Sequence, residues 1–144
     1  MFSKACEYGI RATIHIAHQS KQDERVSLKA VAKAIDSPVA FTAKILQALA
    51  KDGLIISTKG PTGGYEISAK KKDEIMLLQI VKAIDGNKIY NGCALGLKQC
   101  NAEKPCPLHD QFITIRSELK NMLANTSIQE LASGLKEEIY FLKR

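Results

Sequence analysis

The sequence predicts a mainly α-helical fold with one small β-hairpin, and three observations support this prediction. Apolar residues recur at helical spacing along most of the chain, one short segment is rich in β-formers, and one long stretch has no period. The chain has 144 residues, which is a usual size for one domain, and it is 45% hydrophobic and 25% charged. These values are typical of a globular protein and exclude a disordered chain.

Two helices are predicted before residue 36. The first spans residues 4–20, where Ile10, Ile14 and Ala17 fall on one face. The polar residues 20–24 form a loop. Ser27 is then in place to cap a second helix, because its hydroxyl can accept a backbone N–H of the first turn.

A third helix follows the interruption Asp36-Ser37-Pro38. Pro38 suits the first turn of this helix, with Ser37 as its cap. The helix runs to about Lys51, and Gly53 ends it. Its expected buried residues are Val39, Ile45, Leu46 and Leu49.

A β-hairpin is predicted after the third helix. Residues 54–58 and 65–68 are rich in β-formers, and the six residues Lys59–Gly64 between them contain three glycines and a proline. A lysine run at residues 70–72 follows the second strand.

The second half contains helices and one long loop. A helix is expected from near Asp73 to Gly86, followed by a loop at residues 87–106, whose length is typical of a functional segment. A long helix then runs from Pro107 to about Asn125, and Thr126 or Ser127 caps a short helix through Leu131. A charged tail at residues 136–144 ends the chain. The long helix has a heptad-like apolar stripe of Leu108, Phe112, Ile115, Leu119 and Met122, which predicts a homodimer interface.

The positive charge lies in one half of the chain. Residues 1–72 hold 12 Lys and Arg against 6 Asp and Glu, whereas residues 73–144 hold 9 of each kind. We therefore expect a polyanion-binding domain at residues 1–72 and a sensor and dimerisation region at residues 73–144. No apolar run is long enough for a membrane span, and the N-terminus lacks a secretory signal, so a cytoplasmic location is expected.

Three helices followed by a hairpin have the order of a winged helix-turn-helix, which binds double-stranded DNA with its third helix in the major groove. Glycines at the hairpin tip allow close approach to the backbone, and Lys59 can reach a minor groove or a phosphate. Phe41 and Thr42 could instead belong to the core. The candidate DNA-binding residues are Ser27, Pro38, Ala40, Phe41, Thr42, Lys44, Lys59, Gly60, Pro61, Gly63 and Gly64.

The cysteines are candidates for a metal site. Cys93, Cys100 and Cys106 fall within fourteen residues, and His109 follows three residues after the last. In a reducing cytosol such a cluster indicates metal binding or redox chemistry rather than disulfides. Three thiolates and one imidazole suit an iron–sulfur cluster, although zinc accepts the same ligands and the cysteines could also be unligated.

Three short motifs are distinctive in this chain. They are Cys6-Glu7-Tyr8-Gly9-Ile10-Arg11-Ala12 near the start, Asp52-Gly53-Leu54 after the third helix and, the most specific of the three, Gly60-Pro61-Thr62-Gly63-Gly64-Tyr65 in the hairpin. With these motifs the sequence resembles the IscR/NsrR-type transcriptional regulators, the bacterial Rrf-two family of winged-helix repressors and activators. The resemblance covers nearly the whole chain and includes the cysteine loop.

The resemblance implies a homodimer, paired through the long helix, with a cluster on Cys93, Cys100 and Cys106. The fourth ligand is His109 in the IscR-type pattern, which we prefer, whereas Glu7 takes this role in the NsrR-type pattern. Two positions depart from the family. Lys59 replaces the Arg that probes the minor groove, and Ala43 replaces a Glu on the recognition helix, which alters the expected DNA sequence preference.

The sequence therefore predicts a non-enzymatic regulator, without catalytic residues, that binds a near-palindromic operator as a homodimer. An iron–sulfur cluster, expected to be [2Fe–2S], would set the operator affinity and sense redox state or nitric oxide. One alternative is a winged-helix regulator controlled by thiol oxidation or a partner protein. Another is an iron–sulfur electron-transfer protein. Cys6 lies next to Glu7 and could take its place as a ligand, but we expect it to be a buried small side chain.

Overall fold

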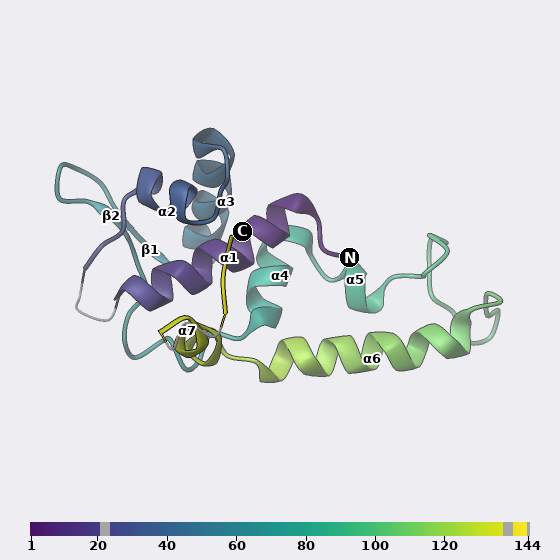
Figure 1. Cartoon of the computed structure of the whole chain (residues 1–144). Coiled ribbons are helices and arrows are strands. Elements are labelled where there is room, and N and C mark those ends of the chain that lie inside the picture. The colour runs from purple at the N-terminus through teal and green to yellow at the C-terminus, as the bar shows by residue number, and fades with distance from the viewer. Residues whose placement is uncertain (21–23, 137–139, 144) are drawn as a thin grey trace.

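The computed structural model describes residues 1–20, 24–136 and 140–143. Within these residues the chain forms seven helices and one two-stranded sheet, which confirms the predicted fold class (Figure 1). The elements are α1 (Lys4–Gln19), α2 (Leu28–Ala34), α3 (Val39–Lys51), β1 (Ile56–Thr58), β2 (Gly64–Glu66), α4 (Leu77–Asp85), α5 (Lys88–Asn91), α6 (His109–Asn125) and α7 (Ile128–Lys136). Parts of the predicted loop at residues 20–24 and of the predicted tail at residues 136–144 lie outside the described residues.

Helix α1 is the central helix of the molecule, and its bounds differ from the predicted residues 4–20 by one residue. Ser3 caps its first turn, because the Oγ atom accepts a hydrogen bond from the backbone N–H of Cys6 at 3.1 Å. The Oγ of Ser20 donates to the Ile16 carbonyl at 2.7 Å at the other end. Helices α3, α4 and α7 pack around α1. The helix is therefore in contact with both halves of the chain.

Helices α2 and α3 form the predicted helix-turn-helix. The Oγ of Ser27 accepts the Ala30 N–H at 3.2 Å and caps α2, as expected. Asp36 adopts a φ of 52°, which lets the chain reverse direction between the two helices. Gly53 adopts a φ of 73° just beyond α3, a left-handed conformation that favours glycine and ends the helix.

The start of α3 differs from the prediction. Pro38, and not Ser37, is the N-cap residue, and its carbonyl accepts both the backbone N–H and the hydroxyl of Thr42 at 2.9 Å. The Ser37 hydroxyl contacts the Thr42 hydroxyl instead, at 2.7 Å. Val39 was expected to be buried, but it is 43% exposed because the first turn of α3 extends beyond the core.

Strands β1 and β2 form an antiparallel hairpin, which we call the wing (residues 56–66). They pair Ile56 with Glu66 and Thr58 with Gly64, so the strands are shorter than predicted. The reason is that Leu54 and Ile55 lie in the core before the hairpin begins. Val26 pairs with Tyr65 on the other side of β2, with both N–H to O distances at 2.8 Å.

Helix α4 begins at Leu77, four residues later than predicted. The preceding segment makes long-range backbone bonds that a local sequence period cannot reveal. The Leu77 N–H donates to the Thr126 carbonyl at 3.0 Å, and the Ile128 N–H donates to the Ile75 carbonyl at 2.9 Å. The extended backbone before α4 is thereby paired with the segment that joins α6 to α7.

The predicted loop at residues 87–106 contains the short helix α5, so we use the name cysteine loop for residues 92–108 only. The long helix α6 is confirmed and projects from the rest of the molecule, with the cysteine loop at its free end (Figure 1). Ser127 caps α7 through the Glu130 N–H at 3.1 Å, but α7 extends past Leu131.

A single hydrophobic core joins the two halves of the chain. Its members come from the first half, for example Ile16 and Leu46, and also from the second half, for example Ile80, Leu123 and Ile128. The predicted boundary at residue 72 is thus not a boundary between separate cores. Among the described helices, none combines the length and the apolar character needed to cross a membrane.

Candidate DNA-binding surface and cysteine loop

The N-terminal part of α3 presents several predicted residues to solvent. Pro38, Ala40 and Lys44 are exposed, whereas Phe41 is half-buried and packs edge-to-face on Tyr8, with ring centroids 5.8 Å apart. Phe41 therefore has both a packing role and a partly accessible ring. Lys44 extends the positive charge of this half of the chain over the exposed face of α3.

The prediction for Thr42 is wrong. The side chain is completely buried, and its hydroxyl contacts Ser37 at 2.7 Å and donates to the Pro38 carbonyl at 2.9 Å. A buried side chain cannot contact a base edge in a groove of DNA. Thr42 instead stabilises the first turn of the helix that carries the exposed residues.

A groove of about 480 Å³ lies between the start of α2, the helix α3 and the wing. Ser27 lines this groove together with the predicted wing residues Lys59, Gly60, Pro61, Gly63 and Gly64. The groove is also lined by Gln47, which the sequence analysis did not select. The sequence contained a pattern that could have identified Gln47. It shares the helical spacing of the exposed α3 residues Ala40, Lys44 and Lys51.

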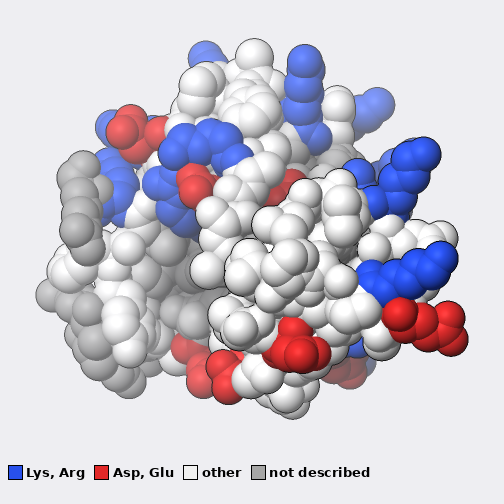
Figure 2. All heavy atoms as spheres, turned by 90° about the vertical axis from the view of Figure 1, so that its right-hand side faces the viewer, with Lys and Arg blue, Asp and Glu red and all other residues white. Residues whose placement is uncertain are grey.

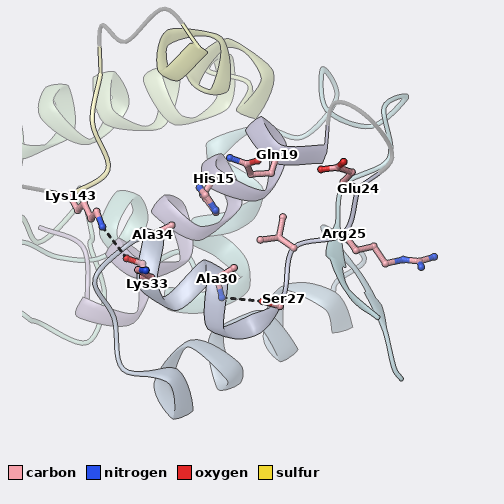
Figure 3. A pocket seen from close by; sticks show the side chains of 10 residues that line it. His15, Gln19, Glu24, Arg25, Ser27, Ala30, Lys33, Ala34 and Lys143 are labelled. Atoms are coloured by element: carbon pink, nitrogen blue, oxygen red, sulfur yellow. Dashed lines mark hydrogen bonds between the residues drawn. The ribbon is translucent and has the colours of Figure 1, made fainter. Parts of the chain in front are cut away.

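Arg25 is a second residue that the sequence analysis missed. Its Nη1 donates to the Thr62 carbonyl at the wing tip at 3.3 Å, and its Nε lies 3.6 Å from the Glu66 carboxylate. Figure 3 shows the Arg25 side chain directed away from a separate hollow of about 730 Å³, which is lined by His15, Ala30 and Lys143 among others. Arg25 is one of the residues that line this hollow, but its hydrogen bond and its ion pair are both made with the wing.

Gly64 shows why the wing requires glycine. Its φ is 142°, and a Cβ atom there would lie 2.8 Å from the Val26 carbonyl oxygen. A larger residue would separate β2 from Val26 and move the wing. The glycine therefore fixes the position of Lys59 relative to α3.

Two of the predicted metal ligands meet in the cysteine loop. The Sγ of Cys100 lies 3.4 Å from Nδ1 of His109, and the Nη2 of Arg116 donates to the same sulfur at 3.1 Å. The backbone N–H of His109 donates to the Cys106 carbonyl at 3.0 Å. The first turn of α6 therefore holds the end of the loop next to Cys100.

Cys93 lies in an environment that favours its thiolate. Backbone N–H groups of Leu97 and Leu95 donate to its sulfur and lower the pKa of Cys93 below the ordinary value of 9.0. Burial opposes this effect, while a hydrogen bond from Cys106 and the charge of Arg116 add to it. Cys93 and Cys106 are thus neighbours, and Cys93 has the character of a metal-binding or reactive thiol.

The donor set fits a soft metal group, and one atom in particular supports this. His109 is only 7% exposed, and its Nε2 is buried without a hydrogen-bond partner. Unpaired buried polar atoms are rare, and a lone pair on Nε2 is what a metal ligand requires. In the described part of the chain, however, no three His, Cys, Asp or Glu side chains are close enough to hold one ion, so the loop must close further to bind one.

Glu7 and Cys6 lie on α1. The Glu7 carboxylate forms an ion pair with Lys4 at 3.0 Å. Cys6 is completely buried, and burial, with a smaller contribution from Asp85, raises the pKa of its thiol to about 12. Cys6 is therefore a core side chain, as expected.

The predicted stripe on α6 is divided between two faces. Phe112 and Leu119 are half-buried, and Leu119 packs against the core of its own chain. Leu108, Ile115 and Met122 are exposed, Ile115 to 54%, and their spacing of seven residues places them on one line along the helix. The exposed apolar stripe thus has three members instead of five.

The end of the molecule that carries the cysteine loop has a distinct surface. Figure 2 shows Lys and Arg at its upper and right edges and few charged side chains at its centre. The exposed apolar residues of this region include Leu95 and Leu97 in the loop and Ile113 and Ile115 on α6.

Three helices followed by a two-stranded wing define a winged helix-turn-helix protein of the DNA-binding regulator class. Residues 2–134 match the model of the Rrf2 family, described as iron-dependent transcriptional regulators. The chain belongs to the Rrf2 family of transcriptional regulators.

Related proteins agree with this assignment. The chain is 27% identical to a candidate HTH-type transcriptional regulator of Aquifex aeolicus over 100% of this chain and 99% of that protein. It is 25% identical to the HTH-type transcriptional regulator IscR of Pectobacterium atrosepticum over 88% of this chain and 76% of that protein.

Solved structures share the fold. The structure of CymR, the global cysteine regulator of B. subtilis, has a TM-score of 0.75 and 25% identity, with 92% of this chain and 96% of that chain covered. The structure of T. potens IscR has a TM-score of 0.73 and 18% identity, with 97% of this chain and 91% of that chain covered. At this identity it supports the fold alone.

Proposed function

We propose that this regulator binds operator DNA in the cytoplasm as a homodimer and that an iron–sulfur cluster on the cysteine loop sets its operator affinity. The observation that carries the proposal is the buried, unpartnered Nε2 of His109, a residue whose Nδ1 lies 3.4 Å from the Cys100 sulfur. Cys93, Cys100 and Cys106 supply three thiolates, and His109 supplies the fourth ligand.

DNA contact is assigned to α3 and the wing. Ala40 and the accessible part of Phe41 can touch thymine methyl groups, whereas Lys44 can bond guanine or phosphate. Gln47, which lines the groove next to the wing, has the amide group suited to adenine. Lys59 at the wing tip adds a cation, although its hydrated ammonium is a weaker minor-groove probe than a guanidinium.

Dimerisation is assigned to the exposed stripe of Leu108, Ile115 and Met122. A second copy of the chain would cover this line of apolar side chains by pairing α6 with its mate. Two copies would then place two α3 helices on half-sites about 34–36 Å apart. This spacing is sensitive to the geometry of α6.

The cysteine loop can influence DNA binding through contiguous packing. The loop joins α6 directly, α6 packs on α4, and α4 packs on α1 and α3. When bound, an iron–sulfur cluster supplies a redox-sensitive group that three thiolates and an imidazole must enclose. Closing the loop around a cluster would fix the first turn of α6, and loss of the cluster would release that turn.

A thiol-controlled regulator without a cluster is the second candidate. The lowered pKa of Cys93 and its position next to Cys106 favour this function, because a thiolate near a second thiol is easily oxidised.

The two candidates differ in the spectrum of the protein. Protein prepared without oxygen and with sufficient iron should be coloured and contain iron and sulfide, and a Cys93→Ser, Cys100→Ser or Cys106→Ser change should remove the colour. His109→Ala should alter the spectrum, whereas Glu7→Ala should leave it nearly unchanged. The opposite pattern would assign the fourth ligand to Glu7. A colourless wild type would refute the cluster and leave the thiol-controlled function.

A further inference from the structure

We propose that Arg116 is the positioning residue of the cysteine loop, which it joins to α6 by contacts with both the beginning of the loop and Cys100. This inference rests on the proposed function of the loop as a ligand site. It assigns to Arg116 the task of holding Cys100 and the start of the loop against α6 before the loop closes on a metal group.

Arg116 makes three hydrogen bonds with three different groups. Its Nε donates to the Phe112 carbonyl, one turn back on α6, at 3.2 Å. Its Nη1 donates to the Gly92 carbonyl, directly before Cys93, and its Nη2 donates to the Cys100 sulfur at 3.1 Å. One guanidinium therefore fixes the two ends of the segment that runs from Gly92 to Cys100.

His109 and Arg116 act on the same sulfur. They are seven residues apart on α6, which is about two turns, so both lie on the face that the loop covers. Cys100 thus has two contacts, His109 Nδ1 at 3.4 Å and Arg116 Nη2 at 3.1 Å. Because Nδ1 is engaged with sulfur, Nε2 is left for another partner.

The charge of Arg116 suits a site that must gather three thiolates. A cation near several thiolates reduces their mutual repulsion, and its field also favours the thiolate of Cys93. A lysine would keep the charge, but it lacks the planar arrangement of donors that reaches a carbonyl and a sulfur together. The positive charge of Arg116 therefore favours the thiolates, and its planar guanidinium holds the Gly92 carbonyl and the Cys100 sulfur at the same time.

The test uses full-length, metal-free protein and Co²⁺ as the probe. We compare Arg116→Gln and Arg116→Lys with the control Lys120→Gln. Lys120 is exposed one turn further along α6, and its ammonium lies 5.9 Å from the centre of the Tyr90 ring on α5, outside the cysteine loop. Arg116→Gln should speed hydrogen exchange of residues 93–105 and weaken Co²⁺ binding by about tenfold or more, as is usual for residues that support metal ligands. Arg116→Lys should restore part of the affinity, and Lys120→Gln should behave like wild type.

The thiolate-to-Co²⁺ absorption band gives a readout that a general loss of packing would not shift. Removing the hydrogen bond to the Cys100 sulfur should move this band to lower energy in Arg116→Gln but not in Lys120→Gln. Unchanged loop exchange, Co²⁺ affinity and band position in Arg116→Gln would overturn the inference. If Arg116→Gln fails to fold, the same three measurements on Arg116→Lys test the inference, and wild-type values in all three would overturn it. A wild type that never takes up iron would refute the proposed cluster, but the loop exchange would still test Arg116.

Discussion

At the scale of single residues, the basic side chains on α3 and the wing should decide DNA affinity. Lys44→Ala and Lys59→Ala should each weaken binding to an operator selected from random DNA. Each should lower the slope of log K against log salt by about one, because one phosphate contact is lost. Fluorescence anisotropy at several salt concentrations measures both effects.

Two variants serve as controls for this experiment. Thr42→Val removes a buried hydroxyl from the first turn of α3 and should cost about 1 kcal/mol of stability without changing the salt slope. Lys104→Ala removes a charge from the cysteine loop, far from α3. If the Lys44→Ala/Lys59→Ala double variant binds like wild type, the proposed contact surface is wrong.

The sequence predicted the helix-turn-helix and the wing, but it did not predict which of their side chains are exposed. Thr42 has the right chemistry for a base contact, but the Pro38 carbonyl and the Ser37 hydroxyl engage it inside the turn. Arg25 precedes α2 in the chain, and its role depends on the wing tip folding back onto it. Such contacts depend on tertiary structure, which no local pattern contains.

At the scale of elements, the exposed stripe on α6 should form the dimer interface. Ile115→Glu combined with Met122→Glu should give monomers in sedimentation velocity. Pairing two copies of α6 would bury these carboxylates in an apolar interface that offers them no positive partner. Thr114→Glu adds a charge to an exposed α6 position off the stripe and should leave the dimer intact. A dimer that survives the double change would place the interface elsewhere.

Element boundaries were predictable where local chemistry determines them. Ser27 and Gly53 mark the start of α2 and the end of α3 in the sequence as in the structure. The start of α4 was not predictable, because residues 75–77 pair with backbone some fifty residues away. The α6 stripe was predicted too wide, since periodicity identifies apolar positions but not which of them face the chain's own core.

At the scale of the whole molecule, one core connects the DNA-binding helices with the helices that follow the cysteine loop. Helix α1 packs on α7 and α4, and Leu123 and Ile128 join the same core as Ile16. The uneven charge of the sequence predicts two functions, and the fold joins the basic half and the neutral half through one shared core. A structural change in the cysteine loop can therefore reach α3 through α6 and α4, which pack against one another.

The central claim is that the state of the cysteine loop sets operator affinity. The most direct measurement is the operator dissociation constant of one preparation at fixed salt, before and after its iron is removed by a chelator without oxygen. The account predicts a change of about tenfold, the usual size of coupling between two sites, and no change in a Cys93→Ser/Cys106→Ser variant. Equal affinities for the loaded and the iron-free wild type, with both still dimeric, would contradict it.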